Sequence, residues 1–143
     1  DQALRRAGVA PDALAAARAR ARQALSMTLA DARGRWILAA HPKARNEWPL
    51  TGVVAGRLHH VIVDRSFLDA AGGAEVRWII DYKNAAHDGG DRDGFLAAQV
   101  ELYRPQLELY AALVGQLDAR PVRCGLYFPL LAAWREVLLP VGE

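Results

Sequence analysis

Asp81 and Lys83 are a pair of charged residues that a catalytic site could use. They stand two positions apart at the polar end of an apolar run, residues 76–80. In an extended strand, residues i and i+2 point to the same face, so the carboxylate and the ammonium are expected side by side. A carboxylate that can hold a divalent cation, next to an ammonium group, suits phosphodiester hydrolysis.

Asp64 supplies a second acid at the end of another apolar run, residues 58–63. If the two runs pair as a hairpin, Asp64 can meet Asp81. Mg²⁺ (or Mn²⁺) takes a few oxygen ligands and keeps several waters, so the two aspartates and the backbone carbonyl of Tyr82 would suffice. Lys83 would then orient the attacking water or offset charge on the phosphate. A surface Asp–Lys pair worth at most about 1 kcal/mol fits the same spacing, so both interpretations stay open.

A second signal is a polar stripe in an expected long helix, with spacings of four, three and four residues: Gln99, Tyr103, Gln106 and Tyr110. Residues at these spacings share one helix face. Amide and phenol groups on one face suit hydrogen bonds to phosphates and sugars, with tyrosine rings against bases. A half-buried helix that packs on a sheet with its polar tips in water would show the same stripe.

The elements that must position these residues follow from hydrophobic period and from Gly and Pro punctuation. We expect one helix from Pro11-Asp12 to about residue 32, ended by Gly34, and a long helix over residues 93–117 that Pro105 kinks or splits. Strands are expected over residues 35–39, 48–55, 57–67, 76–83, 122–128 and 134–139. This order predicts an α/β (α+β) fold with a mixed β-sheet flanked by helices.

The composition of the chain limits the classes of protein to which it can belong. The chain has 143 residues, 52% of them hydrophobic and 24% charged, which suits one domain with an N-terminal helical segment (residues 1–33) and a core (residues 34–143). The net charge of +2 neither requires nor excludes nucleic acid. Cys124 is the only cysteine, which excludes an internal disulfide and favours a reducing, cytoplasmic location. No apolar run approaches the roughly 18 residues of a membrane span, so no membrane partner is expected. The sequence opens on Asp1 without an initiator methionine, and we expect a fragment of a longer chain.

Three motifs in order carry a resemblance to a known family: Val-Asp-Arg at residues 63–65, Trp-Ile-Ile-Asp-Tyr-Lys at residues 78–83 and Gln-Leu-Glu-Leu-Tyr at residues 106–110. Together they resemble the RecB-like branch of the PD-(D/E)xK nucleases, and above all the C-terminal nuclease domain of UvrD/AddA-type helicase–nucleases. That family has an aspartate on one strand, Asp-Tyr-Lys on the next, and Gln-x-x-x-Tyr on the following helix. The resemblance covers most of the chain from about Arg35 onward and implies a restriction-endonuclease-like fold.

The resemblance implies roles residue by residue. Asp64 and Asp81 match the metal-binding acids, and Lys83 matches the catalytic lysine. Gln106 and Tyr110 match the helix motif that positions DNA or the active-site lysine.

Other positions complete the expected site. Arg65 and Arg104 stand next to Asp64 and Gln106 in the sequence and are candidates for DNA contact. Glu47 falls where these domains often carry an acid before the first core strand. The family also carries a metal-binding histidine on a helix upstream of the acids, and the expected N-terminal helix has none. His60 shares the strand parity of Asp64 but stands roughly 13 Å away along the strand.

Two classes of function follow. The first is a metal-dependent DNA nuclease domain, exonuclease or single-strand endonuclease, of an ATP-dependent helicase–nuclease in double-strand break repair. Its partners would be DNA strands fed by the motor, the helicase domain of the parent chain and a second subunit, and the chain itself has no Walker A motif. The second is an inactive nuclease-like domain that serves DNA binding or subunit interaction. A small mixed α/β domain with an accidental motif is a third interpretation.

Overall fold

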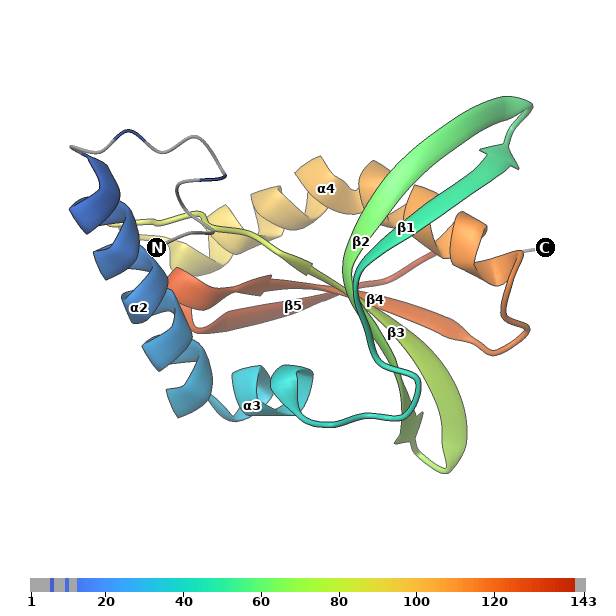
Figure 1. Cartoon of the computed structure of the whole chain (residues 1–143), viewed down its shortest axis with the longest axis horizontal. Helices are drawn as coiled ribbons and strands as arrows, with labels where there is room; N and C mark the ends of the chain where they lie inside the picture. The colour runs from blue at the N-terminus through green and yellow to red at the C-terminus, as the bar shows by residue number, and fades with distance from the viewer. Residues whose placement is uncertain (1–5, 7–9, 11–12, 141–143) are drawn as a thin grey trace.

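Five strands form a mixed sheet in the order β1-β2-β3-β4-β5. The computed structural model describes residue 6, residue 10 and residues 13–140. The strands are β1 Arg45–Val54, β2 Arg57–Ala71, β3 Ala74–Tyr82, β4 Val122–Phe128 and β5 Ala133–Val137. β3 and β4 pair in parallel, and the other neighbouring strands pair antiparallel (Figure 1).

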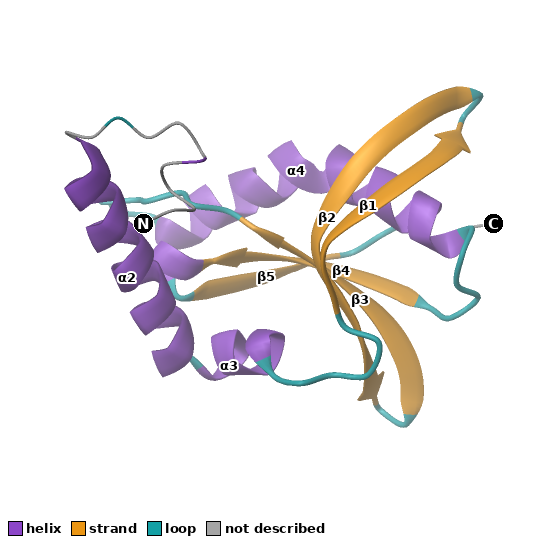
Figure 2. Ribbon diagram, in the orientation of Figure 1, coloured by secondary structure: helices purple, strands orange, loops and turns teal. Residues whose placement is uncertain are grey.

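Three helices of the described residues flank this sheet: α2 Leu14–Ala30, α3 Ala32–Leu38 and α4 Arg92–Gly115 (Figure 2). α4 connects β3 to β4, because parallel strands cannot be joined by a tight turn and need a long crossover. The predicted mixed sheet flanked by helices is therefore confirmed, and the arrangement is in line with an α+β nuclease-like fold.

Alternate residues of β3 enter two apolar clusters, one on each face of the sheet. Ile79 packs in a cluster with Leu107 and Leu113 of α4. Trp78 and Ile80 pack in the other cluster, which includes residues of α3 and β2. A strand that is covered on both faces reads in sequence as a nearly continuous apolar run. The run at residues 76–80, interrupted only by Arg77, identified β3.

The predicted strand over residues 35–39 is wrong, because most of this segment belongs to helix α3. The Asp31 side chain accepts a hydrogen bond from the backbone N–H of Gly34 at 3.1 Å and so caps α3. The same carboxylate oxygen accepts from the Tyr127 hydroxyl of β4 at 3.0 Å. Because Asp31 satisfies a free N–H of a new helix, helical structure does not end at Gly34 and extends to Leu38.

β4 has the predicted bounds, and the boundaries of the other elements differ from the predictions by a few residues. β1 begins at Arg45 and β2 continues to Ala71, so both strands are longer than predicted. α4 passes through Pro105 as one helix and is not split there. The predicted helix start at Pro11-Asp12 lies outside the described residues. Among the described residues, no helix combines the length and the apolar character that a membrane crossing needs.

Gly34→Ala should destabilise the chain by about 2 kcal/mol, as overpacking typically does. A methyl group at this position would lie 2.2 Å from the Thr28 carbonyl oxygen and 2.7 Å from the Tyr127 hydroxyl. Relieving that overlap must shift α2 or β4 away from α3, which outweighs the gain in helix propensity of about 1 kcal/mol. Urea unfolding measures the difference.

Gly115→Ala at the end of α4 is the matched control, because nothing lies within 4 Å of a Cβ atom there. We expect this variant to be as stable as the parent or slightly more stable. Equal stability of the Gly34→Ala variant and the parent would contradict the close approach of the helices to Tyr127.

Candidate active site

Asp64 and Asp81 lie opposite each other on neighbouring strands. Arg65 of β2 pairs with Ile80 of β3, and one further step in this antiparallel register sets Asp64 against Asp81. The backbone N–H of Tyr82 donates to Asp64 Oδ2 at 2.8 Å, which holds the Asp64 side chain at the end of β3. The predicted pairing of the two strands is confirmed, and it brings the two acids together.

Lys83 follows β3 directly, and its ammonium nitrogen lies 2.7 Å from Asp81 Oδ2. The backbone N–H of Lys83 donates to the Tyr127 carbonyl oxygen at 2.9 Å, so β4 fixes the backbone at this position. The ammonium nitrogen also lies 3.8 Å from the ring centroid of Tyr103 on α4, a cation–π contact. The carboxylate and the ring together hold the positive charge beside the two acids.

Asp81 is only 3% exposed, and burial raises the pKa of its carboxyl group to about 6. The ion pair with Lys83 opposes this rise, whereas the nearby Asp64 adds to it. The 2.7 Å contact with Lys83 lacks the alignment of a hydrogen bond, and Oδ2 has no other donor among the described residues. This buried oxygen therefore keeps lone-pair capacity that a bound cation could use.

A pocket of about 490 Å³ opens beside Asp64 and is lined by Asn46, Glu47, Asp64, Tyr82 and Asn84, whereas Asp81 and Lys83 do not line it. Glu47 lies opposite Asp64 in the register of β1 and β2 but is not itself paired. Its φ of 47° is in the left-handed region, which costs a residue with a Cβ atom about 1 kcal/mol or more. The pocket thus carries Glu47 as a second acid besides Asp64, on a strained backbone and at a position whose role the sequence left open.

The donor set suits a hard cation but is small. Among the described residues, no group of three His, Cys, Asp or Glu side chains is placed to hold a metal ion. The carboxylates of Asp64 and Asp81 remain, and Mg²⁺ accepts so few protein ligands because it keeps several waters. The residues of α2 that share a pocket with Asn84 are Ala17, Arg20, Ala21 and Ala24. None of these four side chains is a metal ligand, so the upstream helix adds nothing to the donor set there.

Gln106 and Tyr110 are bonded to each other, with Gln106 Nε2 donating to the Tyr110 hydroxyl at 2.6 Å. Tyr110 is 6% exposed and packs in the apolar cluster of α4. Tyr103, which belongs to the polar stripe that was expected to offer tyrosine rings to bases, contacts the Lys83 ammonium. Its helical spacing from Gln106 and Tyr110 identified its face, but no local pattern indicated this contact with Lys83.

Arg65 and Arg104 are not brought to the acids. Arg65 is 7% exposed, and its guanidinium donates to Asn46 Oδ1 and to two backbone carbonyls at the end of α3. Arg104 donates to both carboxylate oxygens of Glu101 and to a carbonyl beyond β5. Arg65 therefore links β2 to the end of α3, and Arg104 links α4 to the segment after β5.

The histidines also lie elsewhere. His60 Nδ1 is 2.8 Å from the Thr51 hydroxyl on the exposed part of the β1–β2 hairpin. His41 stacks on Phe67 with a centroid distance of 4.0 Å, and His87 stacks on Phe95 at 4.5 Å. None of the three lines the pocket beside Asp64.

The chain matches no protein-family model, and no curated protein matches its sequence. Its function must therefore be inferred from the two acids, the lysine and the pocket beside them.

Proposed function

We propose that this chain is a metal-dependent nuclease domain that hydrolyses phosphodiester bonds of single-stranded DNA. The observation that supports it is the cluster of Asp64, Asp81 and Lys83 at the end of β3. Asp81 is buried beside a second carboxylate, and the like charge of Asp64 adds to the cost of ionising it. A buried acid whose pKa is raised in this way is common at catalytic sites.

In the proposed mechanism, Asp64, Asp81 and the Tyr82 carbonyl oxygen hold Mg²⁺ or Mn²⁺. The bound ion would lower the pKa of its water and polarise the scissile phosphate. Lys83 keeps a positive charge beside the acids, where it can orient the attacking water or stabilise charge that develops on the phosphate. The contacts of its ammonium with Asp81 and the Tyr103 ring set the position of this charge in advance.

We further propose that the domain belongs to an ATP-dependent helicase–nuclease that processes double-strand breaks in the cytoplasm. The support is the resemblance of three motifs in order, at residues 63–65, 78–83 and 106–110. A helicase domain in the parent chain would feed single strands to the pocket beside Asp64, and a second subunit would assist it.

A second candidate is a nuclease-like domain that binds DNA or another subunit without cutting. The observation in its favour is the small donor set, since no third carboxylate or imidazole among the described residues joins Asp64 and Asp81. Metal binding separates the two candidates, because only the nuclease needs a bound cation.

Asp64→Asn should weaken Mn²⁺ binding by about tenfold or more, since it removes one of two charged ligands. Isothermal titration of the chain with MnCl₂ measures the affinity. Asp88→Asn, which changes a carboxylate in the loop before α4, is the matched control and should leave the affinity unchanged. Equal Mn²⁺ affinity of the Asp64→Asn variant and the parent would favour the second candidate.

A further inference from the structure

A second, larger pocket of about 860 Å³ lies toward the beginning of β3 and carries four cationic side chains. It is lined by Lys43, Ala44, Arg45, Trp48, Arg77, Leu117, Asp118, Ala119 and Arg120. Its walls come from the segment before β1 and the first residues of β1, from β3 and from the turn after α4. Asp118 is the only acid among the lining residues, so the pocket is strongly basic.

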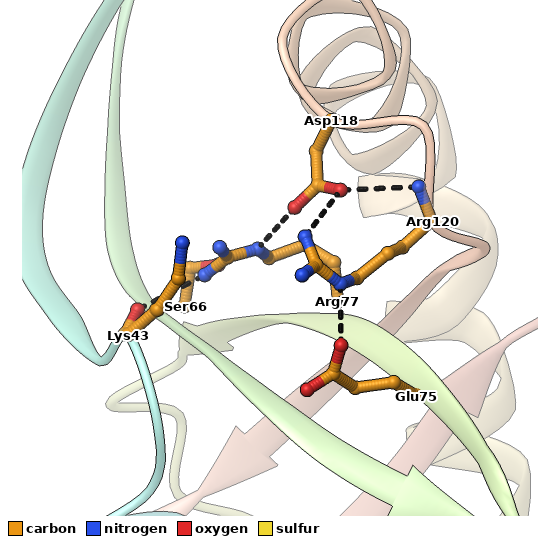
Figure 3. Close-up of polar contacts among 6 residues, drawn as sticks. All are labelled: Lys43, Ser66, Glu75, Arg77, Asp118 and Arg120. Carbon is orange, nitrogen blue, oxygen red and sulfur yellow. Dashed lines mark hydrogen bonds and ion pairs between the residues drawn. The ribbon is translucent and has the colours of Figure 1, made fainter.

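Asp118 fixes two of the guanidinium groups in place (Figure 3). Its Oδ2 accepts from Arg77 Nε at 3.1 Å, and its Oδ1 accepts from Arg120 Nη1, also at 3.1 Å. Arg77 Nη1 further donates to the Lys43 carbonyl oxygen, and Arg120 Nε donates to Glu75. Among the described residues, Nη2 of neither guanidinium has an acceptor. Arg120, whose side chain is 36% exposed, thus keeps a donor open for a ligand, whereas Arg77 is almost fully buried and contributes its charge from the floor of the pocket.

Lys43 and Arg45 add positive charge at the mouth of this pocket. Both side chains are exposed, and neither forms an ion pair with a described residue. Four cations against the carboxylates of Asp118 and Glu75 leave two positive charges, as many as the net charge of +2 of the whole chain. The remaining residues are net neutral, so this pocket carries the electrostatic excess that attracts anions.

We propose that this basic pocket binds the phosphate groups of a single-stranded nucleic acid. Guanidinium groups held in a fixed orientation match the oxygen geometry of phosphate, and exposed cations add the long-range attraction. The half-buried Trp48 ring lines the same pocket, 5.1 Å from the Arg45 guanidinium, and offers aromatic surface to a base. Charge and an aromatic ring together are the usual features of single-strand binding sites.

Neighbouring residues of β1 line the basic pocket and the pocket beside Asp64. Arg45 and Trp48 line the basic pocket, and Asn46 and Glu47 between them in the sequence line the other. Arg77 precedes Asp81 by four residues on β3, which is about 13 Å along an extended strand. A nucleic-acid strand anchored at the basic pocket can therefore continue to the acids. That continuation rests on the proposed nuclease function, whereas binding at the basic pocket does not.

Fluorescence anisotropy with a labelled oligothymidylate, measured in EDTA, tests the basic pocket without any cleavage. Arg45→Glu should weaken binding several-fold and lower the log–log salt slope by about 0.7, the contribution of one phosphate contact on a single strand. Lys43→Glu/Arg45→Glu should weaken binding about tenfold or more and lower the slope by about 1.4. Circular dichroism verifies that the variants fold.

Arg57→Glu is the matched control, because Arg57 is exposed and begins β2 as Arg45 begins β1. It makes the same change in net charge and should leave both the affinity and the slope close to those of the parent. An equal loss in Arg57→Glu would mean that net charge alone governs binding, and it would overturn the pocket assignment. The proposal also fails if the parent chain does not bind the oligonucleotide, or binds an oligoglutamate peptide instead, which would indicate an acidic protein partner.

These results are independent of the nuclease proposal. Cleavage with Mn²⁺ reports on Asp81 and Lys83, whereas anisotropy in EDTA reports on Lys43 and Arg45. If the chain binds the oligonucleotide through the basic pocket but does not cut it, the binding site is supported and the proposed nuclease function is refuted.

Discussion

Asp81→Asn and Lys83→Ala should each reduce Mn²⁺-dependent cleavage of single-stranded DNA by about a thousandfold or more. Asp81 is one of two charged ligands of the proposed cation, and Asn keeps its shape but removes its charge. Lys83→Ala removes the one ammonium group beside the acids, and the loss of such a preorganised charge falls on the transition state. Single-turnover cleavage of a labelled oligonucleotide measures both effects.

The control for these variants is Asp88→Asn, at an exposed loop position that does not line the pocket beside Asp64 and should retain full cleavage. In the proposed parent helicase–nuclease, ATP-driven DNA unwinding should remain intact in all three variants, because the proposed motor is a separate domain. Full cleavage by either the Asp81→Asn or the Lys83→Ala variant would refute the assignment of the site.

Asp81→Asn should also stabilise the metal-free chain at pH 8 by about 2–3 kcal/mol while leaving its stability at pH 4 nearly unchanged. Burial raises the pKa of Asp81 from 3.8 to about 6, so the folded state binds this proton more tightly than the unfolded state does. The stabilising contribution of the protonated carboxyl is therefore complete below the unfolded pKa and is lost as the pH rises through about 6. Asn cannot ionise, so the variant avoids the cost of a buried charge at high pH.

Urea unfolding of the parent and the variant in EDTA, from pH 4 to pH 8, measures this difference. The free energies of unfolding of the parent and the variant should be nearly equal near pH 4. They should diverge as the pH rises from there to about 6. Asp88→Asn, in the loop before α4, should run parallel to the parent at every pH. A stability difference between parent and Asp81→Asn that does not depend on pH would contradict the raised pKa. A buried carboxylate that lowers the free energy of unfolding is expected at a functional site.

Much of the fold could be predicted from local patterns. β3 was predicted because it is buried on both faces, which favours a run of apolar residues, here interrupted only by Arg77. β4 was predicted at its observed bounds, residues 122–128. The segment 35–39 was mistaken for a strand, because Gly34 was taken as the end of helical structure. A cap by Asp31, and the close approach of Gly34 to Tyr127, keep it helical.

The candidate site also has some features that the sequence predicts and others that depend on the tertiary structure. The pairing of Asp64 with Asp81 and the contact of Asp81 with Lys83 follow from strand period and register, which are local properties of the sequence. The identity of the lysine's second contact, Tyr103, depends on how α4 crosses the sheet. Arg65 looked equally suited to DNA by its position in sequence, but the end of α3 takes its guanidinium.

The sequence by itself determined the central strands, the order of the elements and the two acids with their lysine. These features depend on the spacing of residues that are close in the sequence. The geometry of a strand or a helix places residues at such spacings on one face, and a hairpin pairs the residues of neighbouring strands. Only the tertiary structure decided that Asp81 is buried with a raised pKa, that Glu47 joins the pocket, and that Asp118 holds two arginines in a basic pocket. Burial and ion-pair partners arise where segments distant in the chain meet, and no local spacing specifies which segments those are.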